Sequence, residues 1–142
     1  MFLSKATEYA IRALIFIKAN GQKHSGFREI AKEIGAPEPY TGKVMQVLVK
    51  RGILKSSKGP GGGFYIDPAE APIPLIKIGE AMEGTDTFTK CGLGLKECSA
   101  ANPCPIHNEF AKIRNQYRDL VSKESIWSMA EKINNGQAVI KR

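Results

Sequence analysis

The stretch from residue 27 to residue 66 limits the possible folds more than any other part of the chain. It begins with a helix whose apolar face, at helical spacing, consists of Phe27, Ile30, Ala31 and Ile34. Gly35 ends this helix, and Pro37 and Pro39 break the chain because each excludes its preceding residue from the helical region. Pro39 can open a second helix that runs to Arg51. Two short helices joined by such a turn form a helix-turn-helix.

A short β-hairpin is predicted directly after the second helix. Its strands are Ile53-Leu54 and Phe64-Tyr65-Ile66, and a glycine-rich tip joins them. The tip superficially resembles a phosphate-binding loop, but it lacks the G-K-[ST] ending and no helix follows it. We therefore predict a mainly α fold with a small β-hairpin: a winged helix-turn-helix domain with a long dimerisation helix after it.

The charge of this region points to duplex DNA as the partner. Between Lys43 and Lys58 the chain has five cations and no acidic residue, within a net charge of +7. On the second helix, Gln46 can hydrogen-bond a base edge and Lys43 can reach guanine. We expect Tyr40, Val44, Val47 and Leu48 to pack inward and Thr41, Lys43, Gln46 and Lys50 to point outward. The candidate DNA-binding residues are Tyr40, Thr41, Lys43, Gln46, Lys50, Lys55, Ser56, Lys58, Gly59 and Gly61. The alternative is a solvated helix face.

The remaining segments divide the chain into three parts. A helix from Ser4 to Ala19 is apolar over much of its circumference and needs partners on more than one side. A proline-rich connector leads to a short helix from Leu75 to Met82. We assign residues 1–84 to the DNA-binding domain, 85–104 to a cysteine-bearing loop without apolar periodicity, and 105–142 to a dimerisation helix and a C-terminal helix.

The long helix after Pro105 carries a narrow apolar seam, with spacings of four, three, four and three residues. A seam of this kind predicts a two-fold homodimer, which would place two recognition helices about one turn of DNA apart. The candidate dimer residues are Ile106, Phe110, Ile113, Tyr117 and Leu120. The last helix is expected from Ile126 to Ile133, with Ser125 as its cap and a loose tail from Asn134.

Three cysteines gather in the irregular loop. Cys91, Cys98 and Cys104 have six and five residues between them, and His107 follows three positions after the last. Zinc accepts three thiolates and an imidazole, but its usual two-to-four-residue knuckle is absent. An iron–sulfur cluster tolerates longer loops between its ligands. The third interpretation is that the cysteines form a metal-free thiol sensor.

Other function classes find little support. No stretch approaches the roughly 20 apolar residues of a membrane helix, and no targeting pattern is found, so we expect a cytoplasmic protein that does not bind membranes. The odd number of cysteines fits a reducing compartment. His24 lies in a loop of Gly, Lys and Ser, and neither a Ser–His–Asp set nor a carboxylate pair emerges, so we do not expect an enzyme.

Several motifs resemble the Rrf-two (Rrf2) family of winged-helix transcription regulators, the group of IscR-like and NsrR-like iron–sulfur regulators. The resemblance covers nearly the whole chain. It is carried by the N-terminal segment SKATEYA from Ser4, Ile30-Ala31 before the turn, the wing segment KGPGGGF from Lys58, and the three-cysteine loop. Lys58 stands where arginine is frequent in the family, and the six-residue first gap departs slightly from the commonest spacing.

The resemblance implies a homodimer that binds a palindromic operator under the control of an iron–sulfur cluster sensing redox state, nitric oxide or iron supply. The matching cysteines, Cys91, Cys98 and Cys104, are then cluster ligands. The fourth ligand is either His107 or, from the first helix of the partner, Glu8. We favour [2Fe-2S] with His107, and [4Fe-4S] or Glu8 ligation is the alternative. A cluster-free or zinc-containing regulator with structural or redox-active cysteines remains the competing interpretation.

Overall fold

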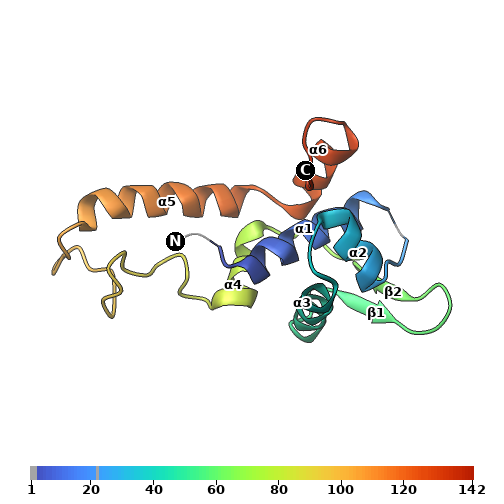
Figure 1. Ribbon diagram of the computed structural model, residues 1–142. Coiled ribbons are helices and arrows are strands. Elements are labelled where there is room, and N and C mark those ends of the chain that lie inside the picture. The colour runs from blue at the N-terminus through green and yellow to red at the C-terminus, as the bar shows by residue number, and fades with distance from the viewer. Residues whose placement is uncertain (1–2, 22) are drawn as a thin grey trace.

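The computed structural model describes residues 3–21 and 23–142; residues 1–2 of the predicted DNA-binding domain and residue 22 lie outside that description. The described chain folds into helices and one two-stranded antiparallel sheet, as predicted (Figure 1). Its elements are α1 (Lys5–Ala19), α2 (Phe27–Ile34), α3 (Glu38–Lys50), β1 (Lys55–Ser57), β2 (Gly63–Tyr65), α4 (Leu75–Glu83), α5 (His107–Lys123) and α6 (Ile126–Asn134). Among the described residues, no helix combines the length and apolarity that crossing a membrane requires.

Helix α1 forms the centre of the core. Ser4 caps its first turn by accepting a hydrogen bond from the backbone N–H of Thr7, as the sequence predicts. Helices α2, α3, α4 and α6 all pack against α1. Leu14 and Ile17 of α1 are almost completely buried, and each such side chain contributes about 1.5–3 kcal/mol by leaving water.

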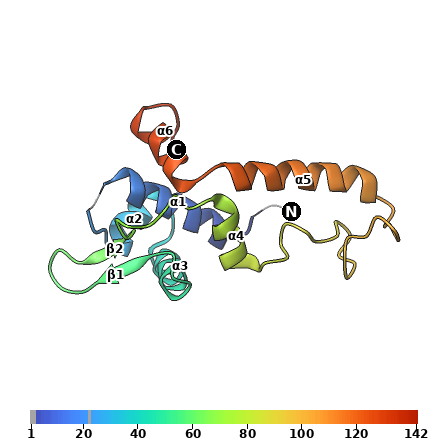
Figure 2. The same cartoon turned by 180° about the vertical axis from the view of Figure 1, so that it is seen from behind.

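Helices α2 and α3 form the predicted helix-turn-helix. Gly35 ends α2 in the left-handed conformation, with φ of +69°, a conformation that costs glycine no steric energy. Helix α3 begins one residue earlier than predicted, so that Pro39 occupies its second position. In both views α3 and the hairpin lie on the same side of the body (Figures 1 and 2).

The hairpin corrects one predicted strand. Strand β1 begins at Lys55, which pairs with Tyr65, and the prediction that Ile53 and Leu54 form the strand is wrong. The backbone N–H groups of Ile53 and Leu54 both donate to the carbonyl oxygen of Leu48, at 3.0 and 3.3 Å. These two buried residues therefore close the end of α3 instead of joining the sheet ladder.

Helix α5 extends from the body as an arm, and an irregular segment runs from α4 below it to its far end (Figures 1 and 2). The segment from 85 to 104 has neither helix nor strand, as expected. Helix α6 then returns to pack on α1, and a capping box at Ser125 and Ser128 starts it.

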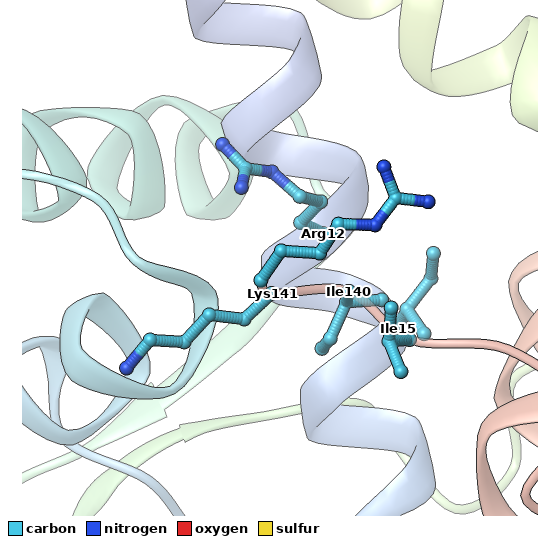
Figure 3. A pocket seen from close by; sticks show the side chains of 6 residues that line it. Arg12, Ile15, Ile140 and Lys141 are labelled. Carbon is cyan, nitrogen blue, oxygen red and sulfur yellow. The ribbon is translucent and has the colours of Figure 1, made fainter.

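The tail after α6 is more ordered than predicted. Figure 3 shows it lying across α1, with Ile140 beside Ile15 and Lys141 extending past them. The Lys141 ammonium donates to the carbonyl oxygen of Lys32 at 2.9 Å, and the Arg12 guanidinium donates to that of Ile34 at 2.8 Å. The expectation of a loose tail is therefore wrong, because an apolar side chain and a cation hold it against α1 and the last turn of α2.

Gly63 is expected to be required for attachment of the hairpin to the body. A Cβ atom there would lie 2.7 Å from the backbone C and O of Ser25, and φ is +145°. Gly63→Ala should lower the free energy of unfolding by about 1–3 kcal/mol, measured by urea denaturation. Gly26→Ser is the control, because no atom lies within 4 Å of its Cβ position and serine suits the N-cap. Equal losses in the two variants would contradict this role for Gly63.

Candidate nucleic-acid interface and cysteine site

Helix α3 presents one buried and one exposed face. Thr41, Val44, Met45 and Leu48 are buried. Lys43, Gln46 and Lys50 are exposed, as predicted. The outward placement of Thr41 is wrong: its hydroxyl donates to the carbonyl oxygen of Pro37 at 2.8 Å.

Tyr40 and Val47 were expected to pack inward, and this is also wrong. Val47 is 37% exposed because it shares the stripe of Lys43 and Lys50, three or four residues away, rather than the stripe of Leu48. The ring of Tyr40 is exposed to a similar extent and meets the ring of Tyr9 edge-on, with centroids 5.5 Å apart. Tyr40 therefore remains on the accessible surface with Lys43, Gln46 and Lys50, whereas Thr41 is buried.

The hairpin presents the candidate wing residues to solvent. Lys55, Ser56, Lys58, Gly59 and Gly61 are all exposed. His24, to which the sequence analysis gave no role, contacts both strands of the hairpin. Its ring stacks on Tyr65 with centroids 4.1 Å apart, and its Nδ1 lies 2.8 Å from the hydroxyl of Ser57.

The cationic side chains of this surface are not paired with acidic side chains of the described residues. In the part of the chain that the structure describes, Lys43, Lys50, Arg51, Lys55 and Lys58 take part in no ion pair. Their positive charge is therefore not neutralised within the protomer. A surface with this charge, formed by a helix and a β-hairpin, can meet the phosphates on both sides of a DNA groove.

Aromatic residues anchor the cysteine loop to the helices. Phe88 is buried, with its ring packed on Gly79 of α4 and 5.8 Å from the ring of Tyr117 on α5. Phe110 of α5 lies so close to Gly92 that a Cβ atom there would approach its ring to 2.8 Å. The loop is thus packed on α4 at one point and on α5 at two.

Glu83, at the end of α4, links the start of the loop to α1. Its carboxylate accepts hydrogen bonds from the backbone N–H of Ser4, the hydroxyl of Thr7 at 3.0 Å and the hydroxyl of Thr87 at 3.5 Å. Burial favours a higher pKa for Glu83, but the hydrogen bonds from Ser4, Thr7 and Thr87 outweigh it, and the pKa lies below its usual value. Glu83 therefore carries its charge at neutral pH and holds three segments together.

The four candidate ligands lie in two pairs, Cys98 with His107 and Cys91 with Cys104. The Sγ of Cys98 lies 3.3 Å from the Nδ1 of His107. Cys91 is buried, and the backbone N–H of Leu93 donates to its Sγ at 3.4 Å. The amides of Leu93 and Leu95 and a hydrogen bond with the side chain of Cys104 lower the pKa of the Cys91 thiol. Across residues 3–21 and 23–142, no three His, Cys, Asp or Glu side chains gather closely enough to hold one metal ion.

This donor set fits an iron–sulfur cluster. Cluster thiolates stand farther apart than the ligands of one ion, and N–H groups aimed at sulfur stabilise clusters, as Leu93 is aimed at Cys91. The free thiols are all in this loop. His107 lies beside Cys98, whereas Glu8 pairs with Lys5 on α1 at 3.2 Å. Within one protomer His107 is thus the candidate beside a loop thiol, whereas a Glu8 ligand would come from the first helix of the partner.

The apolar seam of α5 divides into two sets. Phe110 and Tyr117 turn toward the cysteine loop of their own protomer. The other three residues, Ile106, Ile113 and Leu120, remain exposed at seven-residue intervals, with Ile113 and Leu120 more than half exposed at 51% and 53%. The exposed stripe is therefore narrower than the sequence predicts.

Comparison with known proteins agrees with these features. The model of the Rrf2 family, described as iron-dependent transcriptional regulator, matches residues 3–132. A putative HTH-type transcriptional regulator of Aquifex aeolicus (strain VF5) is 33% identical over 128 residues, covering 89% of this chain and 89% of that protein. These relatives are regulators, and they support the expectation that the chain is not an enzyme.

Solved structures share the fold. CymR (YrzC), the global cysteine regulator of B. subtilis, superposes with a TM-score of 0.74 at 18% identity, covering 97% of this chain and 99% of that one. T. potens IscR superposes with a TM-score of 0.73 at 21% identity, covering 98% and 93%. The chain belongs to the Rrf2 family of winged-helix transcription regulators.

Proposed function

We propose that this regulator is a cytoplasmic homodimer that binds a palindromic site in duplex DNA, under the control of an iron–sulfur cluster at Cys91, Cys98, Cys104 and His107. The contact between Cys98 and His107, at 3.3 Å, carries the proposal, because it pairs a loop thiol with an imidazole at the start of α5. A cluster with mixed cysteine and histidine ligands favours [2Fe-2S], as in Rieske centres. The alternative is [4Fe-4S], or Glu8 from the partner as the fourth ligand.

DNA binding would use α3 in the major groove and the hairpin beside it. The exposed residues Lys43, Gln46 and Lys50 supply one amide and two cations on a single helix face. Lys55 and Lys58 on the hairpin can reach phosphates or a narrow minor groove.

Dimerisation would use the exposed stripe of α5. Ile106, Ile113 and Leu120 occupy equivalent heptad positions, so the same stripe of a second copy can pack against them. A two-fold pairing presents two α3 helices to successive half-sites, which is why a palindromic operator is expected.

Control of DNA binding requires a connection between the loop and α3. A bound cluster would be altered or lost on exposure to oxidants or nitric oxide, or when iron is scarce. The chain's own residues form the connection: Phe88 packs on α4, and Glu83 joins the end of α4 to α1. Because α4 and α1 both pack on α3, a change in the order of the loop can shift the tilt of the helix-turn-helix, which consists of α2 and α3.

The competing function is a regulator without a cluster, whose thiols are the redox sensor or hold zinc. Three free thiols in one loop support the thiol sensor: Cys98 and Cys104 are partly exposed, and N–H groups lower the pKa of the buried Cys91 thiol. A colourless protein that resists anaerobic reconstitution with iron and sulfide would support this function.

The first prediction from this function concerns the cluster. Anaerobically purified protein should show visible charge-transfer bands with matching iron and sulfide, and Cys98→Ala should lose them while remaining a folded dimer. Lys96→Ala, an exposed change in the same loop, is the control and should keep them. Cluster loss should alter DNA affinity in the parent but not in Cys98→Ala. Iron content in Cys98→Ala equal to the parent's would refute the ligand set.

The second prediction concerns the dimer. Ile113→Lys places a charge on the exposed stripe of α5 and should shift the protein toward monomers in sedimentation velocity. Asn115→Lys is the matched control, because it adds the same charge to an exposed position about 200° around the helix. If both variants sediment as the parent does, α5 is not the dimer interface.

The third prediction concerns the wing. Lys58→Ala should weaken binding to all duplex sequences alike and lower the slope of log affinity against log salt by about 1 per protomer. Lys77→Ala on α4, equally exposed, should leave the slope unchanged. An unchanged slope for Lys58→Ala would mean that the wing does not touch phosphate.

A further inference from the structure

An open apolar depression of about 570 Å³ lies between α2, α3 and β2. Phe27 from α2, Phe64 from β2 and the α3 residues Pro39, Gly42 and Val47 line it. Lys43 and Gln46, two exposed candidates for DNA contact, complete its wall. The depression therefore lies on the same face of α3 as the predicted base-reading residues.

Two features of the sequence leave this depression open. Gly42 has no side chain, and the nearest atom to its Cβ position is a ring carbon of Phe27, 3.5 Å away. Val47 is exposed because the core beneath α3 is filled by Met45 and Leu48 from the opposite face. Because Gly42 and the exposed Val47 both line it, the depression gives α3 an apolar hollow on a face that otherwise carries polar side chains.

The charge around the hollow selects among possible occupants. Lys43 lines the hollow, Lys50 lies on the same helix and Lys55 on the strand paired with β2; none of the three takes part in an ion pair within residues 3–21 and 23–142. An apolar peptide would leave these charges unmatched, whereas duplex DNA brings phosphates to them. The major-groove edge of DNA has one apolar group, the 5-methyl group of thymine.

We propose that this depression receives a thymine 5-methyl group and makes Gly42 and Val47 determinants of operator sequence. The inference rests on the proposed DNA binding and adds the base that is read. Gln46 at the wall can form its two hydrogen bonds with adenine N6 and N7. The methyl contact and the amide contact together select A·T pairs within each half-site.

The test begins with selection of binding sites from a random duplex library by the full chain, purified anaerobically. Each thymine of the selected site is then replaced by deoxyuridine, which removes only the methyl group. Burying one methyl group corresponds to about fourfold in affinity. We expect a loss of about that size at one position per half-site and none at the others.

Protein variants assign the effect to the depression. Val47→Ala, which removes the wall, and Gly42→Ala, which adds a methyl group to the floor, should each reduce the deoxyuridine penalty at that position. Gly42→Ala is compatible with folding, because alanine suits a helix interior and its Cβ has room. Val49→Ala, on the same helix but outside the lining, should retain the full penalty.

The outcomes separate the two proposals. If the parent protein binds no duplex and selects no sequence, the proposed function fails. If a site is selected and no thymine-to-deoxyuridine change weakens binding, DNA binding stands and the methyl contact is wrong. A penalty that is equal in the parent and in Val47→Ala and Gly42→Ala would place the contact outside the depression and also overturn the inference.

Discussion

The packing of α1 against several elements is the constraint on which the structure depends. Its apolar residues cover more than half of the helix circumference, so one neighbour could not bury them. Four helices satisfy this requirement together. They are α2 and α3, which form the helix-turn-helix, and α4 and α6, which lie on either side of α5 in the sequence. A shift of any one of them changes a surface that the others share, and this gives the molecule a physical route between remote segments.

The cysteine loop lacks regular structure, yet it has defined attachments. Phe88 and Phe110 fix it by ring contacts with glycines and α5, and Glu83 fixes its beginning by accepting hydrogen bonds from α1. Apolar contacts of this kind tolerate small displacements, whereas the directional hydrogen bonds of the partly buried Glu83 carboxylate do not. A change in the loop can therefore shift the ring contacts, while Glu83 connects it to the junction of α1 and α4.

Local signals in the sequence predicted most elements but not their neighbours in space. The caps at Ser4 and Ser125 and the stop at Gly35 depend on nearby backbone groups, and each lies where it was predicted. The faces of α3 depend on what packs against it, so Thr41 and Val47 were assigned to the wrong sides. Ile53 and Leu54 were predicted as a strand because they form a short apolar run, but their N–H groups donate to the end of α3 instead. The depression beside Gly42 joins three elements, and no local pattern marks it.

The tail contributes to the helix-turn-helix although it lies beyond residue 132, where the match to the family model ends. The family match ends at residue 132, whereas Ile140, which packs on the core, and Lys141, which binds the last turn of α2, lie beyond it. The aliphatic part of Lys141 also covers Gly35, 3.4 Å from its Cβ position, at the turn that sets the angle between α2 and α3. The rigidity of that turn therefore depends on a segment far along the chain, separate from the exposed face of α3 and from the loop that carries the thiols.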